Sequence, residues 1–284
     1  MSEAAEQAPK KTYRGNCHCG AFIFEVTVPE IKSVSGCNCS ICTKKGYLLI
    51  FPGDGDFKVV KDEGKLTEYT SSGKYIHKFC SNCGTAVLVH TAVNARTIQD
   101  LNIWSLETTW HDAAKLDPQY DPPKYTGPEP ASIIDGKTYY GSCHCGDVKM
   151  AVKVAGDLEG GTYPDDIVEC NCSICQRGSF IWIYPKKDQV AIEGGENLSE
   201  YVFGTSLCRK AFCKRCGVYL TNDNVPMTEE VISALPPPVQ EWARRKVLPV
   251  TLRALNHVDL GGKVKEQAKR MPGWSVIQPM YVNP

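Results

Sequence analysis

The sequence lacks an excess of charge of either sign. Its 32 Lys and Arg residues balance 32 Asp and Glu residues, so the formal net charge at pH 7 is +0. Proteins that bind nucleic acid or an anionic membrane surface usually carry a basic patch or a strong net charge. The charge balance therefore gives no reason to expect a partner of either kind.

Long apolar runs are also missing. Residues 1–11 are polar, without the apolar region of a signal peptide, and no stretch reaches the roughly 20 apolar residues of a membrane helix. We therefore expect no membrane partner and a cytoplasmic location, with a nuclear location as the alternative. The sequence leaves the oligomeric state open.

A sustained helical periodicity is the third absence. Short runs rich in β-branched and aromatic residues are separated by turn signals, which is typical of a mainly β protein. In the first half of the chain the candidate strands are residues 21–28, 46–51, 57–60, 66–70, 85–89 and 101–104.

What the sequence has in abundance is cysteine. It contains 15 cysteines, an odd number, and no export signal that would favour disulfide bonds. Fourteen of them stand in C-x-C or C-x-x-C spacing. In a reducing compartment, clusters with this spacing indicate metal ligands.

The cysteine clusters occur twice in the same order. The first cluster returns after 126 residues (Cys17 to Cys143), and the second and third both return after 133 (Cys37 to Cys170, Cys80 to Cys213). A constant offset across two clusters indicates a duplicated domain. We therefore expect a disordered tail at 1–12, a first zinc domain at 13–116, a proline-rich linker at 117–137 and a second zinc domain at 138–284.

The second copy is longer than the first in two places. The change of offset places seven extra residues near 155–166, in a stretch of Gly and Asp that predicts a loop. A further addition falls at about 227–247, where Thr228 starts a capped helical pattern, residues 236–238 stop it, and 239–246 suggest a second short helix. We interpret this small helical insertion as surface decoration, the alternatives being a cover for a site or a partner surface.

Each copy contributes seven cysteines to these clusters. Seven thiolates make one closed four-ligand zinc site and one three-ligand site with an open position for water or substrate. The count alone does not say which clusters combine.

Three motifs in fixed order carry a family resemblance. They are G-x-C-x-C-G, then C-N-C-S-x-C followed by a basic residue and glycine, then F-C-x-x-C-G. In these motifs the chain resembles the glutathione-dependent formaldehyde-activating enzymes, a family that includes the animal centromere protein V. The resemblance extends over roughly 13–127 and 138–284 and marks a tandem duplication.

The resemblance implies a mainly β fold of β-tent type and two zinc ions per domain, up to four per chain. By position, the closed sites would be Cys17, Cys19, Cys80 and Cys83 in copy one, and Cys143, Cys145, Cys213 and Cys216 in copy two. The open, catalytic sites would be Cys37, Cys39 and Cys42, and Cys170, Cys172 and Cys175.

The function implied is that of a carbon–sulfur lyase-type enzyme. It would join glutathione to formaldehyde, giving S-(hydroxymethyl)glutathione, or act on a related carbonyl or thiol adduct. An open zinc suits this reaction because it binds a thiol as the thiolate at neutral pH. Lys44, Lys45 and Arg177, which follow the open clusters, are candidates for the carboxylates of glutathione, the alternative being solvated loop residues.

Two other functions compete with the enzyme. One is a non-catalytic, zinc-stabilised binding module of the same fold. The other is a thiol–disulfide redox protein that uses Cys39 and Cys42, which the metal-type spacing of three clusters disfavours.

The remaining signals are weaker. We expect His18 and His144 to be spacers within their C-x-C motifs, because the thiolates already fill the ligand scheme. Arg96 and Arg253 occupy equivalent positions, where an ion pair is the default and binding of a substrate carboxylate the alternative. Cys208, outside the clusters, is expected to be a buried, inert thiol.

The run after the open cluster differs between the copies. In copy two it carries Phe180, Trp182 and Tyr184, and is more aromatic than its counterpart in copy one. It favours a larger, more apolar substrate in copy two.

Overall fold

Strand β2 (Phe22–Pro29) shows why these residues form a sheet. Phe22, Phe24 and Val26 alternate along it and are buried, while the backbone is paired on both sides, with β1 and with β5.

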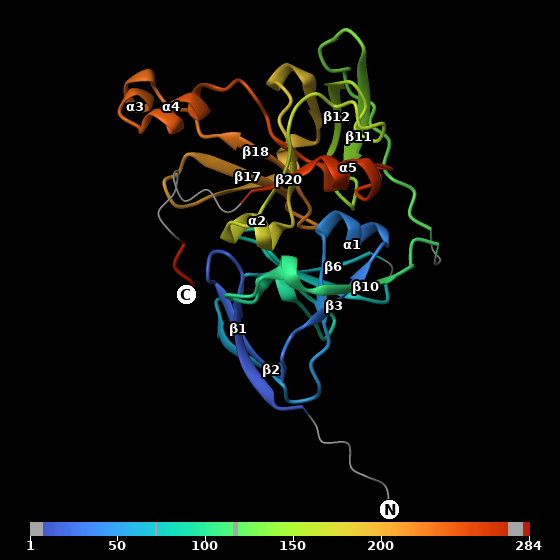
Figure 1. Ribbon diagram of the computed structural model, residues 1–284, viewed down its shortest axis with the longest axis vertical. Helices are drawn as coiled ribbons and strands as arrows, with labels where there is room; N and C mark the ends of the chain where they lie inside the picture. Colours follow the sequence, from blue (N-terminus) through green and yellow to red (C-terminus); the bar gives the residue numbers. More distant parts are fainter. Residues whose placement is uncertain (1–7, 72, 116–118, 272–280) are drawn as a thin grey trace, which may run out of the picture.

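A computed structural model describes residues 8–71, 73–115, 119–271 and 281–284. Figure 1 shows two halves, with the N-terminal half below the C-terminal one.

Copy one contains two sheets. The smaller has the order β1-β2-β5, and the larger has the order β10-β3-β4-β9-β8-β7-β6. The strands besides β2 are β1 (Lys10–Asn16), β3 (Ser33–Cys37), β4 (Leu49–Ile50), β5 (Phe57–Asp62), β6 (Leu66–Thr70), β7 (Ile76–Cys80), β8 (Ala86–Val89), β9 (Ala92–Asn94) and β10 (Glu107–His111).

Copy two repeats this arrangement. Its smaller sheet is β11-β12-β15 and its larger one is β16-β17-β18-β19-β14-β13-β20. The strands are β11 (Gly136–Ser142), β12 (Lys149–Ala155), β13 (Ile167–Cys170), β14 (Ile181–Ile183), β15 (Val190–Glu193), β16 (Leu198–Val202), β17 (Cys208–Cys213), β18 (Tyr219–Asn224), β19 (Val250–Thr251) and β20 (Ala268–Met271).

Strand order in the two halves is equivalent, element by element. Even the single parallel pairing of each larger sheet recurs, β10 with β3 and β20 with β13. The predicted mainly β fold in two tandem copies is therefore confirmed.

Helices are short in both copies. The α-helices are α1 (Ser40–Lys45), α2 (Ser173–Gly178), α3 (Glu229–Ser233), α4 (Pro237–Arg244) and α5 (Gly262–Gln267). The 3-10 helices are η1 (Ala95–Thr97), η2 (Ile103–Ser105), η3 (Lys187–Gln189), η4 (Gly195–Asn197) and η5 (Leu252–Ala254). Helices α1 and α2 lie between the two halves (Figure 1).

The predicted helical insertion of copy two consists of α3 and α4. Thr228 caps α3, its hydroxyl accepting a hydrogen bond from the backbone N–H of Val231. The prolines have a second role that the sequence analysis did not assign, because Pro237 is the first residue of α4. Trp242 and Val239 of α4 pack on Leu207 and Cys208 in a small separate core.

Three expectations differ from the structure. The tail expected at 1–12 is shorter, because Lys10–Thr12 belong to β1 and pair with residues 27–29 of β2. Residues 1–7 of the expected tail lie outside the described residues. The strand expected at 101–104 is instead the start of η2, where the Asn102 side chain caps the turn. The strand expected at 46–51 is reduced to β4.

The hydrophobic core does not stop at the boundary between the copies. One cluster joins Ile41, Tyr47 and Phe79 of copy one to Phe212 and Tyr219 of copy two.

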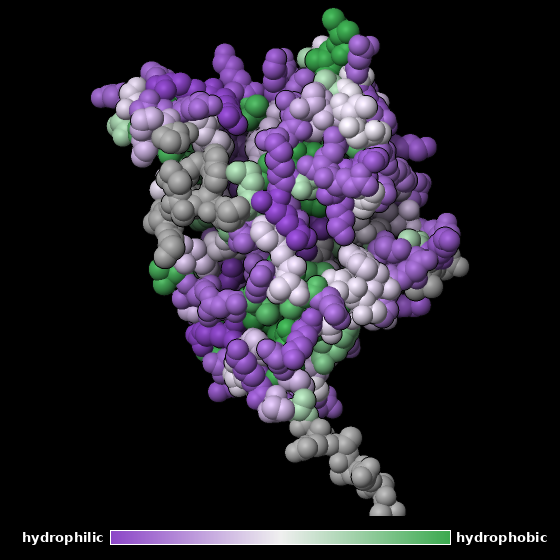
Figure 2. Space-filling model, in the orientation of Figure 1, coloured by the Kyte–Doolittle hydropathy of each residue, from purple (hydrophilic) through white to green (hydrophobic). Residues whose placement is uncertain are grey.

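The face shown in Figure 2 is mostly hydrophilic, with a hydrophobic patch on its lower part, over copy one. Among the described residues, none of the helices combines the length and the apolar character that crossing a membrane requires.

Candidate metal centres

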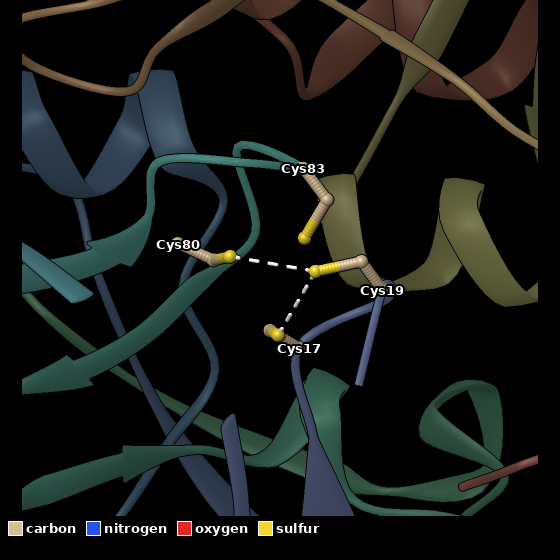
Figure 3. A group of neighbouring side chains, drawn as sticks. All are labelled: Cys17, Cys19, Cys80 and Cys83. Atoms are coloured by element: carbon tan, nitrogen blue, oxygen red, sulfur yellow. Dashed lines mark hydrogen bonds between the residues drawn. The ribbon is translucent and has the colours of Figure 1, made fainter. Parts of the chain in front are cut away.

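The closed cluster of copy one forms from two distant parts of the chain. Cys17 and Cys19 follow β1, and Cys80 and Cys83 lie at the end of β7 and in the turn after it. Figure 3 shows the four sulfur atoms converging, with Cys19 Sγ 3.6 Å from both Cys17 Sγ and Cys80 Sγ. A tetrahedral zinc with Zn–S bonds of about 2.3 Å holds its sulfurs about 3.8 Å apart. The cluster fits such an ion.

Copy two has the same centre. Cys145 Sγ lies 3.4 Å from Cys143 Sγ and 3.5 Å from Cys213 Sγ, and Cys216 completes the group. All four sulfurs lie within 4.8 Å of one another, as they do in copy one.

The open clusters are formed by a strand end and the short helix that follows it. Cys37 ends β3, Cys39 is the N-cap of α1 and Cys42 lies in the helix. Cys170, Cys172 and Cys175 repeat this arrangement at β13 and α2. In each set the three sulfurs lie within 4.8 Å of one another, so the fourteen cysteines form the four sets that the family resemblance implies.

Without a metal, the thiols of an open cluster share protons. Hydrogen bonds from Cys170 and Cys175 hold the pKa of Cys172 well below its usual range, and the positive charge of Lys210 acts in the same direction. Hydrogen bonds to Cys170 and Cys172 raise the pKa of Cys175. A divalent ion would replace the shared protons, so metal binding to this cluster releases protons.

A cavity of about 1190 Å³ borders the open cluster of copy two. Cys170, Cys172 and Cys175 line it, and the two insertions of this copy supply further walls, 163–166 from the loop and Trp242 from α4. Copy one closes another side with residues 98–101. The extra residues of copy two therefore form part of the lining of this cavity. This placement favours the alternative given for the helical insertion, a cover for a site, over surface decoration.

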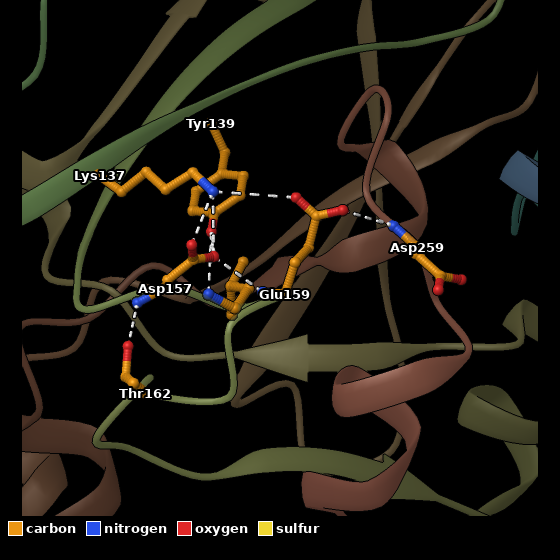
Figure 4. A network of polar contacts seen from close by, with 7 residues as sticks. Lys137, Tyr139, Asp157, Glu159, Thr162 and Asp259 are labelled. Atoms are coloured by element: carbon orange, nitrogen blue, oxygen red, sulfur yellow. Dashed lines mark hydrogen bonds and ion pairs between the residues drawn. The ribbon is translucent and has the colours of Figure 1, made fainter.

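The loop at 156–166 is joined to the small sheet of copy two by polar contacts (Figure 4). Tyr139 Oη donates a hydrogen bond to Asp157 at 2.7 Å, and Lys137 Nζ donates another at 3.0 Å. These two contacts hold the pKa of the Asp157 carboxyl well below its usual range. The backbone N–H of Asp259 donates to Glu159 at 3.2 Å and connects the loop to the C-terminal part of the copy.

Lys210 and Asn222 form a pair of neighbouring polar residues in the lining of the cavity. They face each other across β17 and β18, and both line it. Lys210 is 5% exposed, with Nζ 5.3 Å from the ring centre of Trp182. The buried Asn222 Oδ1 has no hydrogen-bond partner within the described residues. The sequence analysis did not assign Lys210 a role.

The three basic residues proposed to bind carboxylates lie at the interface between the copies. Lys44 Nζ donates hydrogen bonds to Ser142 O and Asn256 Oδ1 of copy two, at 2.9 and 2.8 Å. Lys45 is fully enclosed, 4.6 Å above the ring of Phe79, and burial lowers its pKa to about 8. Neither lysine lines the large cavity, so this placement speaks against their predicted role.

Arg177 does line the cavity, but its guanidinium is largely occupied. It donates to Asn16 O of copy one at 3.1 Å and to the Asn16 side chain at 3.0 Å. A third hydrogen bond, of 3.1 Å, joins it to Ser173 O in its own helix. Arg177 thus joins α2 to Asn16, the residue before the closed-site ligand Cys17 of copy one.

Arg96 and Arg253 bind backbone carbonyls. Arg96 Nε donates to Gly46 O at 2.7 Å, and Arg253 Nε donates to Ser179 O at 2.6 Å. Gly46 and Ser179 are the left-handed C-caps of α1 and α2. The two arginines therefore cap the open-site helices, which is neither of the two roles weighed from the sequence.

The two histidines of the C-x-C motifs connect the copies. His18 Nε2 lies 3.0 Å from Ser173 Oγ, and His144 Nε2 lies 2.9 Å from Ser40 Oγ. Each serine lies between two cysteines of the open cluster of the other copy. The histidines thus join each closed-site loop to the opposite open site.

Each copy also sends an arm onto the other. Tyr120 stacks on His144 and Tyr281 stacks on His18, both with ring centres 4.4 Å apart. Both tyrosines begin a Y-x-x-P motif, whose prolines contact Gly146 and Gly20. These glycines have positive φ, and a Cβ on Gly146 would lie 2.8 Å from Pro123. The predicted linker therefore contains an arm that packs on copy two. The Y-x-x-P motif, which recurs at the end of copy two, is the sequence signal that could have indicated this arm.

Comparison with known proteins gives a relative of known structure and a family. A Rhodobacter sphaeroides protein, solved by crystallography in a structural genomics effort, is 24% identical over 48% of this chain and 99% of its own. Its TM-score of 0.32 supports no conclusion about fold. The model of the family described as glutathione-dependent formaldehyde-activating enzyme matches residues 12–121 and 138–238, one match in each copy. With both copies matched, the chain belongs to this family as a tandem duplicate.

Proposed function

We propose that the chain is a zinc-dependent carbon–sulfur lyase-type enzyme that joins glutathione to formaldehyde or a related small carbonyl compound. The observation that carries the proposal is the cavity beside Cys170, Cys172 and Cys175, which gives a three-thiol cluster room for a ligand. Zinc, with its preference for tetrahedral thiolate sites, fits the four sulfur clusters. Cytoplasmic or nuclear location and a small-molecule partner are part of the same proposal.

Each kind of cluster has its own role in this proposal. The four-cysteine groups are closed structural sites, one in each copy. The three-cysteine groups, Cys37, Cys39 and Cys42 and Cys170, Cys172 and Cys175, leave a ligand position free. Zinc bound there would supply a Lewis acid that favours the thiolate form of an incoming thiol.

In the reaction, the glutathione sulfur forms a bond to the carbonyl carbon and the C=O π bond breaks. The sulfur's proton ends on the former carbonyl oxygen, so no oxidant or reductant is needed. Lys210 lines the cavity beside the cluster and can stabilise the negative charge that develops on this oxygen. Arg245 and Lys186 also line the cavity and are better placed than Lys44 or Lys45 for the carboxylates of glutathione.

A Cys172→Ala variant tests the proposal. We expect four zinc ions per chain in the wild-type protein, heat of binding with millimolar glutathione, and formation of S-(hydroxymethyl)glutathione from formaldehyde. Cys172→Ala should remove the contribution of copy two to that activity, and Cys39→Ala combined with Cys172→Ala should lower the activity about 100-fold or more. The protein should stay folded, because only open-site ligands are removed. His90→Ala, at an exposed turn, is the control and should change neither the zinc content, nor the heat of glutathione binding, nor the rate of product formation.

Three results would count against the proposal. A zinc-loaded protein that gives no heat with millimolar glutathione would exclude glutathione as the substrate. Full activity in Cys172→Ala and in the equivalent Cys39→Ala would exclude catalysis at the open clusters. Four bound zinc ions without turnover of any thiol adduct would favour the non-catalytic binding module.

A further inference from the structure

The cavity of copy two is larger than a formaldehyde adduct requires. Its volume of about 1190 Å³ exceeds the roughly 300–1,000 Å³ of most small-molecule sites. Beyond the cysteines its lining includes five aromatic residues, Tyr163, Trp182, Tyr184, Phe203 and Trp242. Tyr184 and Phe203 are half-buried, so a larger apolar group could cover their exposed parts, which a single added carbon would not.

The aromatic residues are additions to the repeated framework. Trp182 stands where copy one has Leu49, and Tyr184 stands where copy one has Phe51, which is 66% exposed. Tyr163 and Trp242 belong to the two insertions that copy one lacks. Several of the differences between the two copies thus lie in the lining of this cavity.

The polar groups of the cavity follow the same pattern. Lys210 replaces His77, which is buried in copy one with Nδ1 3.3 Å from Tyr47 Oη. Asn222 replaces Val89 and presents an unpartnered oxygen. A buried ammonium beside a buried acceptor suits a ligand hydroxyl, whose oxygen accepts from the ammonium while its O–H donates to the amide oxygen. The hydroxyl of a thiol–aldehyde adduct can do both.

We propose that the copy two cavity binds the glutathione adduct of an aromatic aldehyde. The aldehyde ring packs against the aromatic residues Trp182, Tyr184 and Phe203, and the adduct oxygen lies near Lys210. The glutathione carboxylates meet Arg245 and Lys186, which also line the cavity. The inference rests on the proposed function and names the carbonyl compound that the same site takes. Atoms balance as before: the thiol adds across the C=O bond of the aldehyde, and its proton moves to oxygen.

Two stable thioethers test this without turnover. Calorimetry on the zinc-loaded full-length protein compares S-benzylglutathione, which carries an aromatic ring, with S-methylglutathione, which does not. We expect one S-benzylglutathione site per chain, with an affinity about tenfold or more above that for S-methylglutathione, from burial of the ring. Benzaldehyde should likewise compete with formaldehyde for glutathione turnover.

Substitutions of aromatic residues in the cavity locate the site, and Trp182→Leu introduces the residue of copy one. Trp182→Leu should remove the preference for the benzyl compound while leaving S-methylglutathione affinity within about twofold, since only ring contacts are lost. Because Trp182 is buried, Tyr184→Leu serves as a second, more exposed variant with the same expected direction. Phe51→Ala is the matched control in copy one and should leave both affinities unchanged. Thermal unfolding verifies that each variant is folded.

The possible outcomes separate the two proposals. Equal affinity for both thioethers, two equivalent S-benzylglutathione sites per chain, or a preference unchanged in both Trp182→Leu and Tyr184→Leu would overturn the aromatic assignment. If glutathione binds and turns over formaldehyde in that case, the proposed function stands alone. If glutathione and both thioethers fail to bind the zinc-loaded protein, the proposed function fails as well.

Discussion

Cys17 and Cys172 are both members of sulfur clusters, but their surroundings differ. Cys17 is fully buried and connects the loop after β1 to the turn after β7, about 60 residues later along the chain. Cys172 is the N-cap of a short helix and borders a cavity. The same residue type therefore has a structural function in one position and a proposed chemical function in the other.

Replacing Cys17 should destabilise copy one. A structural zinc site contributes about 10–16 kcal/mol to folding in small zinc domains, and Cys17→Ala removes one of four ligands. We expect loss of one zinc ion and a markedly lower Tm, measured by metal analysis and calorimetry. Cys208→Ala, which removes a buried thiol outside the clusters, should keep the full zinc content. Full zinc content and an unchanged Tm in Cys17→Ala would show that this cluster holds no structural metal.

At the residue scale, the sequence predicted clusters better than side-chain surroundings. Cysteine order and spacing are local properties, and the structure brings the cysteines together in the four expected sets. The environment of Lys44 was not predictable, because its partners Ser142 and Asn256 are about 100 and 200 residues away. The same holds for Lys210, whose importance depends on a cavity made by distant insertions.

At the scale of elements, helices α1 and α2 were missed for a physical reason. With six residues each, they are too short to show a 3.6-residue periodicity, and their caps are cysteines without a side-chain capping bond. Tertiary contacts position them instead, namely Arg96 and Arg253 at their C-caps. The histidines of the opposite copy contact the serine at their first turn.

This arrangement predicts a crossed effect of two mutations. His18→Ala removes contacts to Ser173 and Tyr201, worth about 2 kcal/mol together, and should loosen the open cluster of copy two rather than that of copy one. His144→Ala should do the reverse. Alkylation of cysteines, mapped by mass spectrometry, distinguishes the open clusters of the two copies. His18→Ala should raise the labelling of Cys170, Cys172 and Cys175.

The control for this experiment is His90→Ala, whose side chain is exposed. Labelling should then match the wild-type pattern at every cluster. If His18→Ala instead increased labelling only within copy one, the contact between the copies would have no influence on the open site.

At the scale of the whole molecule, one hydrophobic cluster crosses the boundary between the two copies, and buried cations lie at their interface. Lys44 and Arg177 each reach into the opposite copy, and Tyr219 Oη donates a hydrogen bond to Cys83 O across the boundary. The duplication was evident from the sequence, but this interface was not, because nothing in the offsets of 126 and 133 indicates how two copies pack.

We therefore expect the two copies to unfold together. Calorimetry of the zinc-loaded protein should give a single transition whose calorimetric and van't Hoff enthalpies agree. Removing zinc with a chelator should lower the Tm of the whole chain rather than release one stable half, since each closed site lies next to the interface. Two separate transitions, or a half that stays folded after chelation, would contradict this.

The exchanged arms have a consequence for how such a protein changes over time. Reciprocal contacts of this kind, with Tyr120 on His144 and Tyr281 on His18, are those that two identical chains make around a twofold axis. In a symmetric homodimer one mutation alters both sites at once. Here each half has its own stretch of coding sequence, so Trp182, Lys210 and the two insertions can stand in copy two without a change in copy one. Fusion of the halves thus permits the two sites to differ, although each half still depends on its contacts with the other.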